Sequence, residues 1–206
     1  MIRTKRELYF YILADRMMNR GVFHYSLSDK IKKIFIPDYI MSFLESMRKA
    51  EYYKGKHGII NKLYFYLSSI KYNKLGYKLS FSIGLNTLGY GVSIPHYGTI
   101  IIGKKNSIGK YAVLHTNTCI TSMGTIIGDG LNLSTGSIIT KKIILGNYIT
   151  ICANSIINND FETDRKLIGG NIAKYIKDYP EWYLNDGMTY LNRVKEIEAL
   201  REKMKL

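Results

Sequence analysis

The beginning of the chain alternates apolar and polar residues at helical spacing. Thr4 followed by Glu7 is a capping-box pattern, and Gly21 is the kind of residue that ends a helix. The pattern therefore predicts a helix over residues 5–20.

Further helices are predicted around Pro37 and again near the other end of the chain. One covers about residues 28–35 and is broken by Pro37, which is expected to begin the next helix. Another runs over about residues 59–75 and ends at Gly76. The tail from residue 180 is also predicted to be helical, with an apolar side formed by Leu191, Val194, Ile197, Leu200 and Met204.

The middle of the chain has a different period. An aliphatic residue recurs at every sixth position, with one slip of a single residue, at Ile102, Ile108, Leu114, Ile120, Ile127, Leu133, Ile139, Leu145, Ile151 and Ile157. A period of six fits neither a helix nor a hairpin. It predicts a prism of three short parallel strands per coil of about 18 residues, with one aliphatic side chain per strand on the axis.

The spacing is broken between Ile94 and Ile102, which are eight residues apart rather than six. The two extra residues must bulge outward, within Pro95-His96-Tyr97-Gly98. We therefore expect His96 on a loop that projects from a rigid scaffold, where functional residues are often placed. The alternative is a purely structural histidine.

Charge is distributed unevenly along the 206 residues, whose net charge is +14. Residues 1–78 hold 16 Lys and Arg against 6 Asp and Glu, whereas residues 79–206 hold 14 against 10. This excess suits an anionic partner such as phosphates, an acidic glycan or a membrane surface. A solvated basic face is the alternative, and without a nucleic-acid-binding module we expect no nucleic-acid partner.

Several features point to a cytoplasmic location. No apolar run approaches the roughly 18 residues of a membrane span, and the first residues mix charges with apolar positions, so we expect no secretory signal. Cys119 and Cys152 lack partners at metal-ligand spacing, so neither a metal nor a disulfide framework is expected. Contact with the inner face of the membrane is an option for the basic N-terminal region.

Four segments of the repeat region carry a family resemblance. IPHYGTIIIG is similar to the motif H-x-x-G-I-V-I-G, IGDGLNLSTGSII and LGNYITICANSII to coils of the form I-G-x-x-x-x-I-G-A-G-S-x-V, and KLIGGNIAKYIK to a closing segment V-x-G-x-P-A-K-x-I. Residues 80–178 thereby resemble a left-handed β-helix (hexapeptide-repeat) acyltransferase of the serine acetyltransferase-like branch, closest in kind to capsule and exopolysaccharide O-acetyltransferases. The resemblance implies a mainly β fold, with an α-helical region over 1–78, the β-helix over 79–178 and a C-terminal helix over 179–206.

The resemblance also implies roles for individual residues in acetyl transfer from acetyl-CoA. His96 matches the general base that takes a proton from the acceptor hydroxyl, and Ser122 stands where a backbone N–H helps to hold the oxyanion. His115, nineteen residues after His96, is expected on the adjacent coil as a supporting group or a surface histidine. Coenzyme contacts are expected at Thr135, Gly136, Ala153, Asn154, Gly170 and Lys174, with Lys141 and Lys142 as looser candidates.

The sequence departs from serine acetyltransferases where those enzymes hold serine. Phe81 and Pro95 replace two aspartates, and no G-D-R-H-P loop follows Ser122. A site that lacks the groups for a charged substrate selects a different one. We therefore expect a carbohydrate hydroxyl as the acceptor, with Tyr90, Tyr97 and Tyr111 around it.

Two alternatives to this function stay open. One is serine O-acetylation in cysteine synthesis within the same fold. The other is a non-enzymatic binder that uses the basic helical region. Because members of this family are trimers with sites between subunits, the resemblance implies a homotrimer, or a dimer of trimers if the N-terminal helices pair.

Overall fold

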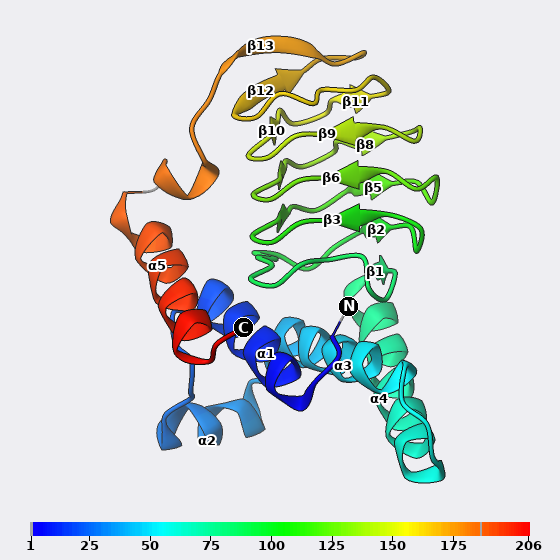
Figure 1. Ribbon diagram of the computed structural model, residues 1–206, viewed down its shortest axis with the longest axis vertical. Helices are drawn as coiled ribbons and strands as arrows, with labels where there is room; N and C mark the ends of the chain where they lie inside the picture. Colours follow the sequence, from blue (N-terminus) through cyan, green and yellow to red (C-terminus); the bar gives the residue numbers. More distant parts are fainter. Residues whose placement is uncertain (1, 186) are drawn as a thin grey trace.

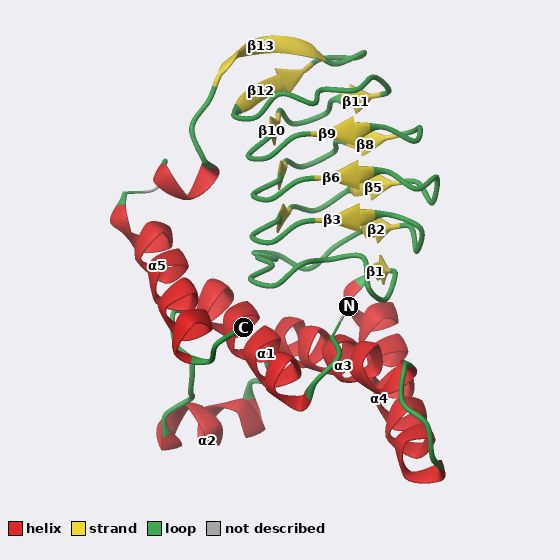
Figure 2. Ribbon diagram, in the orientation of Figure 1, coloured by secondary structure: helices red, strands yellow, loops and turns green. Residues whose placement is uncertain are grey.

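The protein consists of a helical base, a tall β-helix and a helical strap that returns to the base (Figures 1 and 2). The computed structural model describes residues 2–185 and 187–206. The helices are α1 (Lys5–Arg20), α2 (Leu27–Phe35), α3 (Tyr39–Lys54), α4 (Ile59–Leu79) and α5 (Met188–Lys203), with a short 3₁₀ helix, η1 (Trp182–Leu184).

The β-helix is built from three parallel sheets that share each coil. Sheet A stacks β1 (Phe81–Ile83), β2 (Ile100–Ile102), β5 (Thr118–Ile120), β8 (Ile138–Ile139) and β11 (Ile156–Ile157). Sheet B stacks β3 (Ser107–Ile108), β6 (Ile126–Ile127) and β9 (Ile144–Leu145). Sheet C stacks β4 (Val113–Leu114), β7 (Asn132–Leu133), β10 (Thr150–Ile151), β12 (Lys166–Gly169) and the antiparallel β13 (Lys174–Asp178).

The six-residue period is confirmed as the core of this prism. All ten predicted aliphatic positions are at most 3% exposed. In sheet A, Ile102 pairs with Ile120, Ile120 with Ile139, and Ile139 with Ile157, so each coil adds one rung to a continuous aliphatic column. Burial of these stacked side chains is the main stabilising contribution to the prism.

The predicted N-terminal helices are confirmed, with two corrections at their ends. As expected, α1 begins at the capping box of Thr4 and Glu7 and ends at Gly21, whose backbone is left-handed. Asp38, not Pro37, caps α3, because its carboxylate accepts a hydrogen bond from the Met41 N–H. Gly76 does not end α4: a Cβ there would come within 2.9 Å of the Phe81 carbonyl oxygen, so glycine allows the helix to pack closely and continue to Leu79.

The C-terminal strap returns along sheet C to the helical base. After β13, η1 packs against α5, which in turn packs against α1, and Trp182 and Ile197 are buried in a cluster that includes Phe10 and Met18. Of the predicted apolar side of α5, Val194, Ile197 and Leu200 pack in this cluster, as does Met204 just after the helix, whereas Leu191 is not part of it. No helix among the described residues is long and apolar enough to cross a bilayer.

Candidate active site

His96 lies on an exposed loop between two fully buried core residues. Ile94 and Ile100 are both inaccessible to solvent, whereas His96 is exposed and Tyr97 is 76% exposed. Gly98 adopts a φ of +141°, and a Cβ there would come within 3.0 Å of the Thr116 side chain on the next coil. The expected bulge is therefore present, and it projects His96 outward.

The helical base holds both ends of this loop. The Asn19 side chain on α1 accepts a hydrogen bond from the Ile94 N–H (2.9 Å) and donates one to the Val92 carbonyl (2.6 Å). On the far side, the Gly98 N–H donates to the carbonyl of Leu79, the last residue of α4 (3.1 Å). The helices thus act as a positioning device for the histidine loop.

A buried ion-pair network fixes the same base to the first coil. Arg48 on α3 bonds the Asp15 carboxylate on α1 at 2.8 Å and Glu51 at 3.0 Å, and it donates to the carbonyls of Leu88 and Gly89. All three charged side chains are almost completely buried. Such a network is sensitive to the loss of any one partner, because an unpaired buried charge is costly.

His115 lies one coil above His96, as the sequence predicted. Its side chain is half-buried, and its backbone N–H donates to the Leu133 carbonyl at 3.1 Å. Burial, and secondly the positive charge of protonated His96, lower the pKa of His115 below its usual value. The two imidazoles are therefore close enough to influence each other, and His115 favours the neutral form.

No carboxylate orients the His96 ring among the described residues. Phe81, at the position where serine acetyltransferases place an aspartate, is 7% exposed and packs edge-on against Phe43 with ring centroids 5.2 Å apart. Pro95, at the second aspartate position, is exposed. Neither residue places a charge beside His96.

A cavity of about 370 Å³ on the sheet C side of the loop is lined by His115 and by Pro95, which precedes His96 in the chain. Its described lining contains no Asp, Glu, Lys or Arg and combines polar, aromatic and aliphatic side chains: Ser93, Pro95, Val113, His115, Asn132, Tyr179, Trp182, Asn185 and Tyr190. The buried Asn132 Oδ1 has no hydrogen-bond partner among the described residues. Sequence reasoning missed the strap residues of this cavity, because nothing in the repeat indicates where the chain returns.

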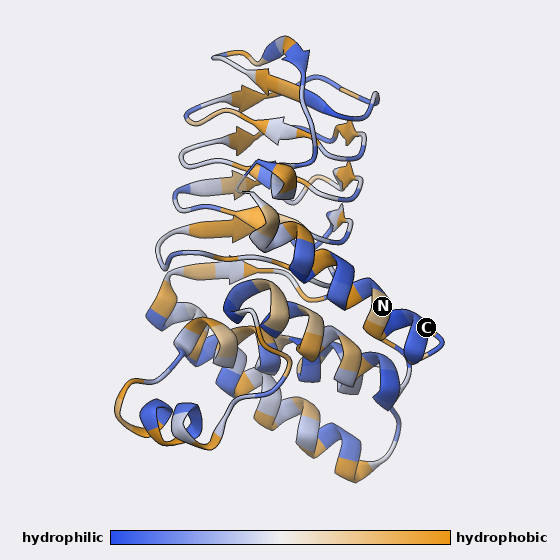
Figure 3. Ribbon diagram, turned by 90° about the vertical axis from the view of Figure 1, so that its left-hand side faces the viewer, coloured by the Kyte–Doolittle hydropathy of each residue, from blue (hydrophilic) through white to orange (hydrophobic). Residues whose placement is uncertain are grey.

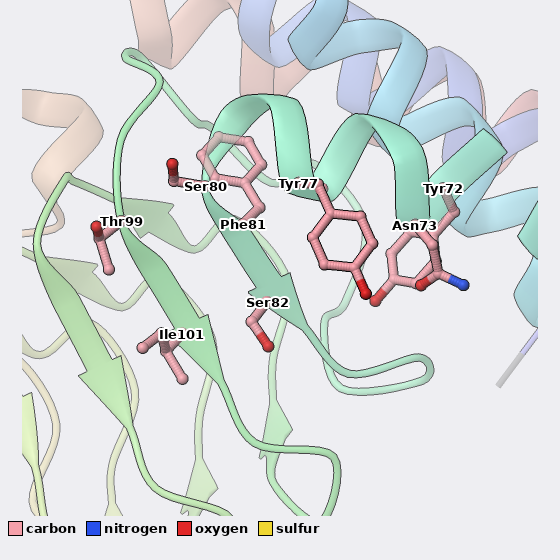
Figure 4. Close-up of a pocket in the computed structure, with 9 residues that line it drawn as sticks. Tyr72, Asn73, Tyr77, Ser80, Phe81, Ser82, Thr99 and Ile101 are labelled. Atoms are coloured by element: carbon pink, nitrogen blue, oxygen red, sulfur yellow. The ribbon is translucent and has the colours of Figure 1, made fainter. Parts of the chain in front are cut away.

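A second cavity of about 360 Å³ lies on the other side of the loop, between the end of α4 and sheet A. Figure 4 shows Ser82 and Ile101 on the outer face of β1 and β2, with Tyr77 to one side and Ser80 and Thr99 at the opposite end. Thr99 comes only three residues after His96. Neutral cavities therefore flank the histidine loop on both sides.

Two of the three tyrosines predicted at the acceptor site lie elsewhere. Tyr90 and Tyr111 are buried, and their hydroxyls donate to the Glu198 carboxylate on α5 at 3.0 and 2.7 Å. Lys110 pairs with the same carboxylate at 2.9 Å. These tyrosines join the strap to the first coils, so we assign them a packing role, and only Tyr97 is exposed next to His96.

The predicted coenzyme contacts form a column on the corner between sheets C and A. The Gly136 backbone N–H donates to the Thr116 carbonyl, and the Asn154 backbone N–H donates to the Thr135 carbonyl. Hydrogen bonds therefore join successive coils at this corner. Thr135, Ala153, Asn154 and Gly170 are exposed or partly exposed along it. The column begins at the His96 loop and ends beside β13, where Lys174 is exposed.

Ser122 lies on a different corner within the same chain. It comes after the C-terminal end of β5 in sheet A and before β6 of sheet B. The His96 loop, in contrast, leads into the N-terminal end of β2 in sheet A. Lys141 and Lys142 share the Ser122 corner, between β8 and β9. One chain alone therefore does not bring Ser122 to His96.

Comparison with solved structures finds serine acetyltransferases. The serine O-acetyltransferase from Brucella melitensis has a TM-score of 0.61 at 13% identity, with 84% of this chain and 69% of that chain covered. The enzyme from Brucella abortus strain S19 gives 0.61 at 14% identity with the same coverage, and that from Neisseria gonorrhoeae gives 0.59 at 14%, covering 86% and 70%. The sequence matches no protein-family model and no curated protein. The similarity establishes a left-handed parallel β-helix of the hexapeptide-repeat type.

Proposed function

We propose that this chain is an O-acetyltransferase that moves an acetyl group from acetyl-CoA to an acceptor hydroxyl. The observation that carries the proposal is the exposed His96 loop, held at both ends by the helical base, at the foot of a column of small corner residues. An accessible imidazole next to a corner that carries small side chains suits a general base beside a long, narrow thioester.

The proposed chemistry needs only a base and hydrogen-bond donors. His96 takes the proton from the acceptor hydroxyl as its oxygen attacks the thioester carbonyl carbon. The tetrahedral intermediate then collapses, the carbon–sulfur bond breaks, and the coenzyme A sulfur leaves and receives the proton from His96. Backbone N–H groups hold the oxyanion, and Ser122 of a neighbouring subunit is our candidate donor.

The corner column is our candidate site for the coenzyme. Thr135, Gly136, Ala153 and Asn154 let a pantetheine arm approach the backbone, because none of these side chains is large. Gly170 lies at the far end of the column, and Lys174 is placed there to pair with nucleotide phosphates.

Two acceptors are supported by different observations. The neutral, aromatic-rich cavity beside His115 and the second neutral cavity near Thr99 favour an uncharged carbohydrate as the acceptor, a molecule larger than an amino acid. The solved structures with the same fold are serine acetyltransferases, which supports L-serine more directly. Phe81 and Pro95 argue against serine, because a zwitterion without charged partners binds poorly.

An acceptor panel separates these alternatives. Release of free coenzyme A from acetyl-CoA is measured with L-serine and with neutral mono- and oligosaccharides. We expect turnover with a saccharide well above that with serine. Robust serine-dependent turnover would select the serine alternative, and the absence of both turnover and coenzyme A binding would favour a non-enzymatic basic binder.

A further inference from the structure

The α2 helix presents an apolar face that nothing in the described chain covers. Its apolar residues follow one another after four, three and one positions, at Leu27, Ile31, Ile34 and Phe35. This spacing places them on one side of the helix. None of its residues is buried. The exposed fractions are 75% for Leu27, 52% for Ile31, 75% for Ile34, 80% for Phe35 and 79% for Ile36, which continues the face.

The segment that carries α2 is nevertheless held firmly at its two ends. Arg20, at the end of α1, forms two hydrogen bonds of 2.6 and 2.7 Å with the Asp38 carboxylate at the start of α3. The Tyr25 ring lies under the Arg16 guanidinium and the Lys33 ammonium. The apolar face therefore belongs to a segment, residues 21–37, that the fold holds in place and that we call the α2 arm.

The polar side of the same arm is basic. Lys30 and Lys32 are exposed and Lys33 is partly exposed, against the single acidic residue Asp29. The helical base as a whole is also basic: residues 1–78, the arm included, carry 16 basic residues against 6 acidic ones. An apolar face bordered by lysines is the pattern of helices that lie in the interface of an anionic bilayer.

The arm lies at the end of the molecule farthest from β13, together with the start of α4 (Figure 1). There Ile59 and Ile60 are 87% and 70% exposed, and Lys62 is exposed nearby. Figure 3 shows apolar residues in the segment after α2 and at the tip of α4, both at this lower end. The β-helix extends away from that end, so a flat surface could contact it without covering the His96 loop.

We propose that the α2 arm docks peripherally on an anionic lipid bilayer. The apolar residues of the arm enter the boundary between headgroups and acyl chains, while the exposed Lys30 and Lys32 contact anionic headgroups. A second copy of the chain fits less well, because a symmetric contact between two arms would bring their lysines together. The proposal does not depend on the acyltransferase activity.

Vesicle co-sedimentation of the full chain tests the proposal. Vesicles of phosphatidylcholine mixed with phosphatidylglycerol are compared with vesicles of phosphatidylcholine alone. We expect binding to the anionic vesicles, weakened at least about tenfold by the double substitution Ile34→Asp/Phe35→Asp and weakened by salt. Lys30→Gln/Lys32→Gln should weaken binding to anionic vesicles specifically.

A matched control uses exposed apolar residues on the β-helix. Met123 and Ile144 are 57% and 42% exposed, and Met123→Asp/Ile144→Asp should leave vesicle binding unchanged. Circular dichroism melting verifies that each variant folds, which we expect because α2 buries no residue. Equal binding by Ile34→Asp/Phe35→Asp and wild type, no binding at all, or self-association that this substitution abolishes would each overturn the proposal.

Discussion

The imidazoles of His96 and His115 occupy different environments on neighbouring coils. His96 is exposed on its loop, whereas His115 is half-buried beside a neutral cavity. A base must reach the substrate and exchange protons, which favours His96, and a neutral imidazole can hydrogen-bond an acceptor, which suits His115. The geometry therefore supports a division of roles between the two residues.

The lowered pKa of His115 predicts a pH-dependent contribution to stability. The unfolded chain binds a proton at His115 more readily than the folded chain, so stability rises with pH until the pH exceeds the unfolded value near 6.5. Urea unfolding at about pH 5 and about pH 7.5 measures the effect. His115→Gln should lose part of the stability difference between the two pH values.

The exposed His57 provides the control for this measurement. His57→Gln should keep the pH difference of the wild type. If His115→Gln also keeps it in full, His115 does not titrate differently in the folded chain.

At the scale of elements, the coil corners depend on residues that tolerate left-handed backbone. Gly136 has a φ of +75°, and a Cβ there would come within 2.1 Å of the Asn154 Oδ1 on the next coil. Asn154 itself has a φ of +56°. The column of candidate coenzyme contacts is therefore shaped by the same local geometry that stacks the coils.

Gly136→Ala should destabilise the β-helix by about 1–3 kcal/mol, because alanine is strained at this positive φ and the Asn154 side chain must move to make room for the Cβ. The midpoint of urea unfolding measures the loss. Gly55→Ala is the matched control, since a Cβ at Gly55 meets nothing within 4 Å, and its effect should stay within about 0.5 kcal/mol. Equal effects of the two substitutions would show that the corner is not constrained.

The elements differ in how well the sequence predicts them. Each coil repeats one local rule, so the core from Ile102 to Ile157 and the bulge at His96 could be read from spacing alone. The end of α4 could not, because it depends on close packing of Gly76 against the Phe81 carbonyl. The roles of Tyr90 and Tyr111 depend on Glu198 of α5, which is 108 and 87 residues away in the sequence. The local sequence pattern carries no information about such a distant contact.

At the scale of the whole molecule, the candidate site is divided between two corners. In one chain, Ser122 and His96 lie at opposite ends of the strands of sheet A. Cyclic symmetry can bring one corner of a subunit against the other corner of its neighbour and repeat the contact at every interface. The helical base also leaves Leu63, Leu67 and Ile70 of α4 more than half exposed, so apolar surface remains for such contacts.

We therefore predict a homotrimer, which becomes a dimer of trimers if the helical bases also pair. Multi-angle light scattering should give about three or six times the 23.7 kDa chain mass. A mass near that of one chain, at micromolar concentration and with full activity, would contradict a site shared between subunits.

The most direct measurement of the central claim is acetyl transfer by His96→Ala, with coenzyme A binding determined in parallel by calorimetry. If His96 is the general base, the substitution should lower kcat by about 10²–10⁴-fold, while coenzyme A affinity and thermal stability stay near those of the wild type. Tyr97→Ala, which removes another exposed side chain from the same loop, should retain far more of kcat. Near-native turnover by His96→Ala would contradict the assignment of His96 as the base.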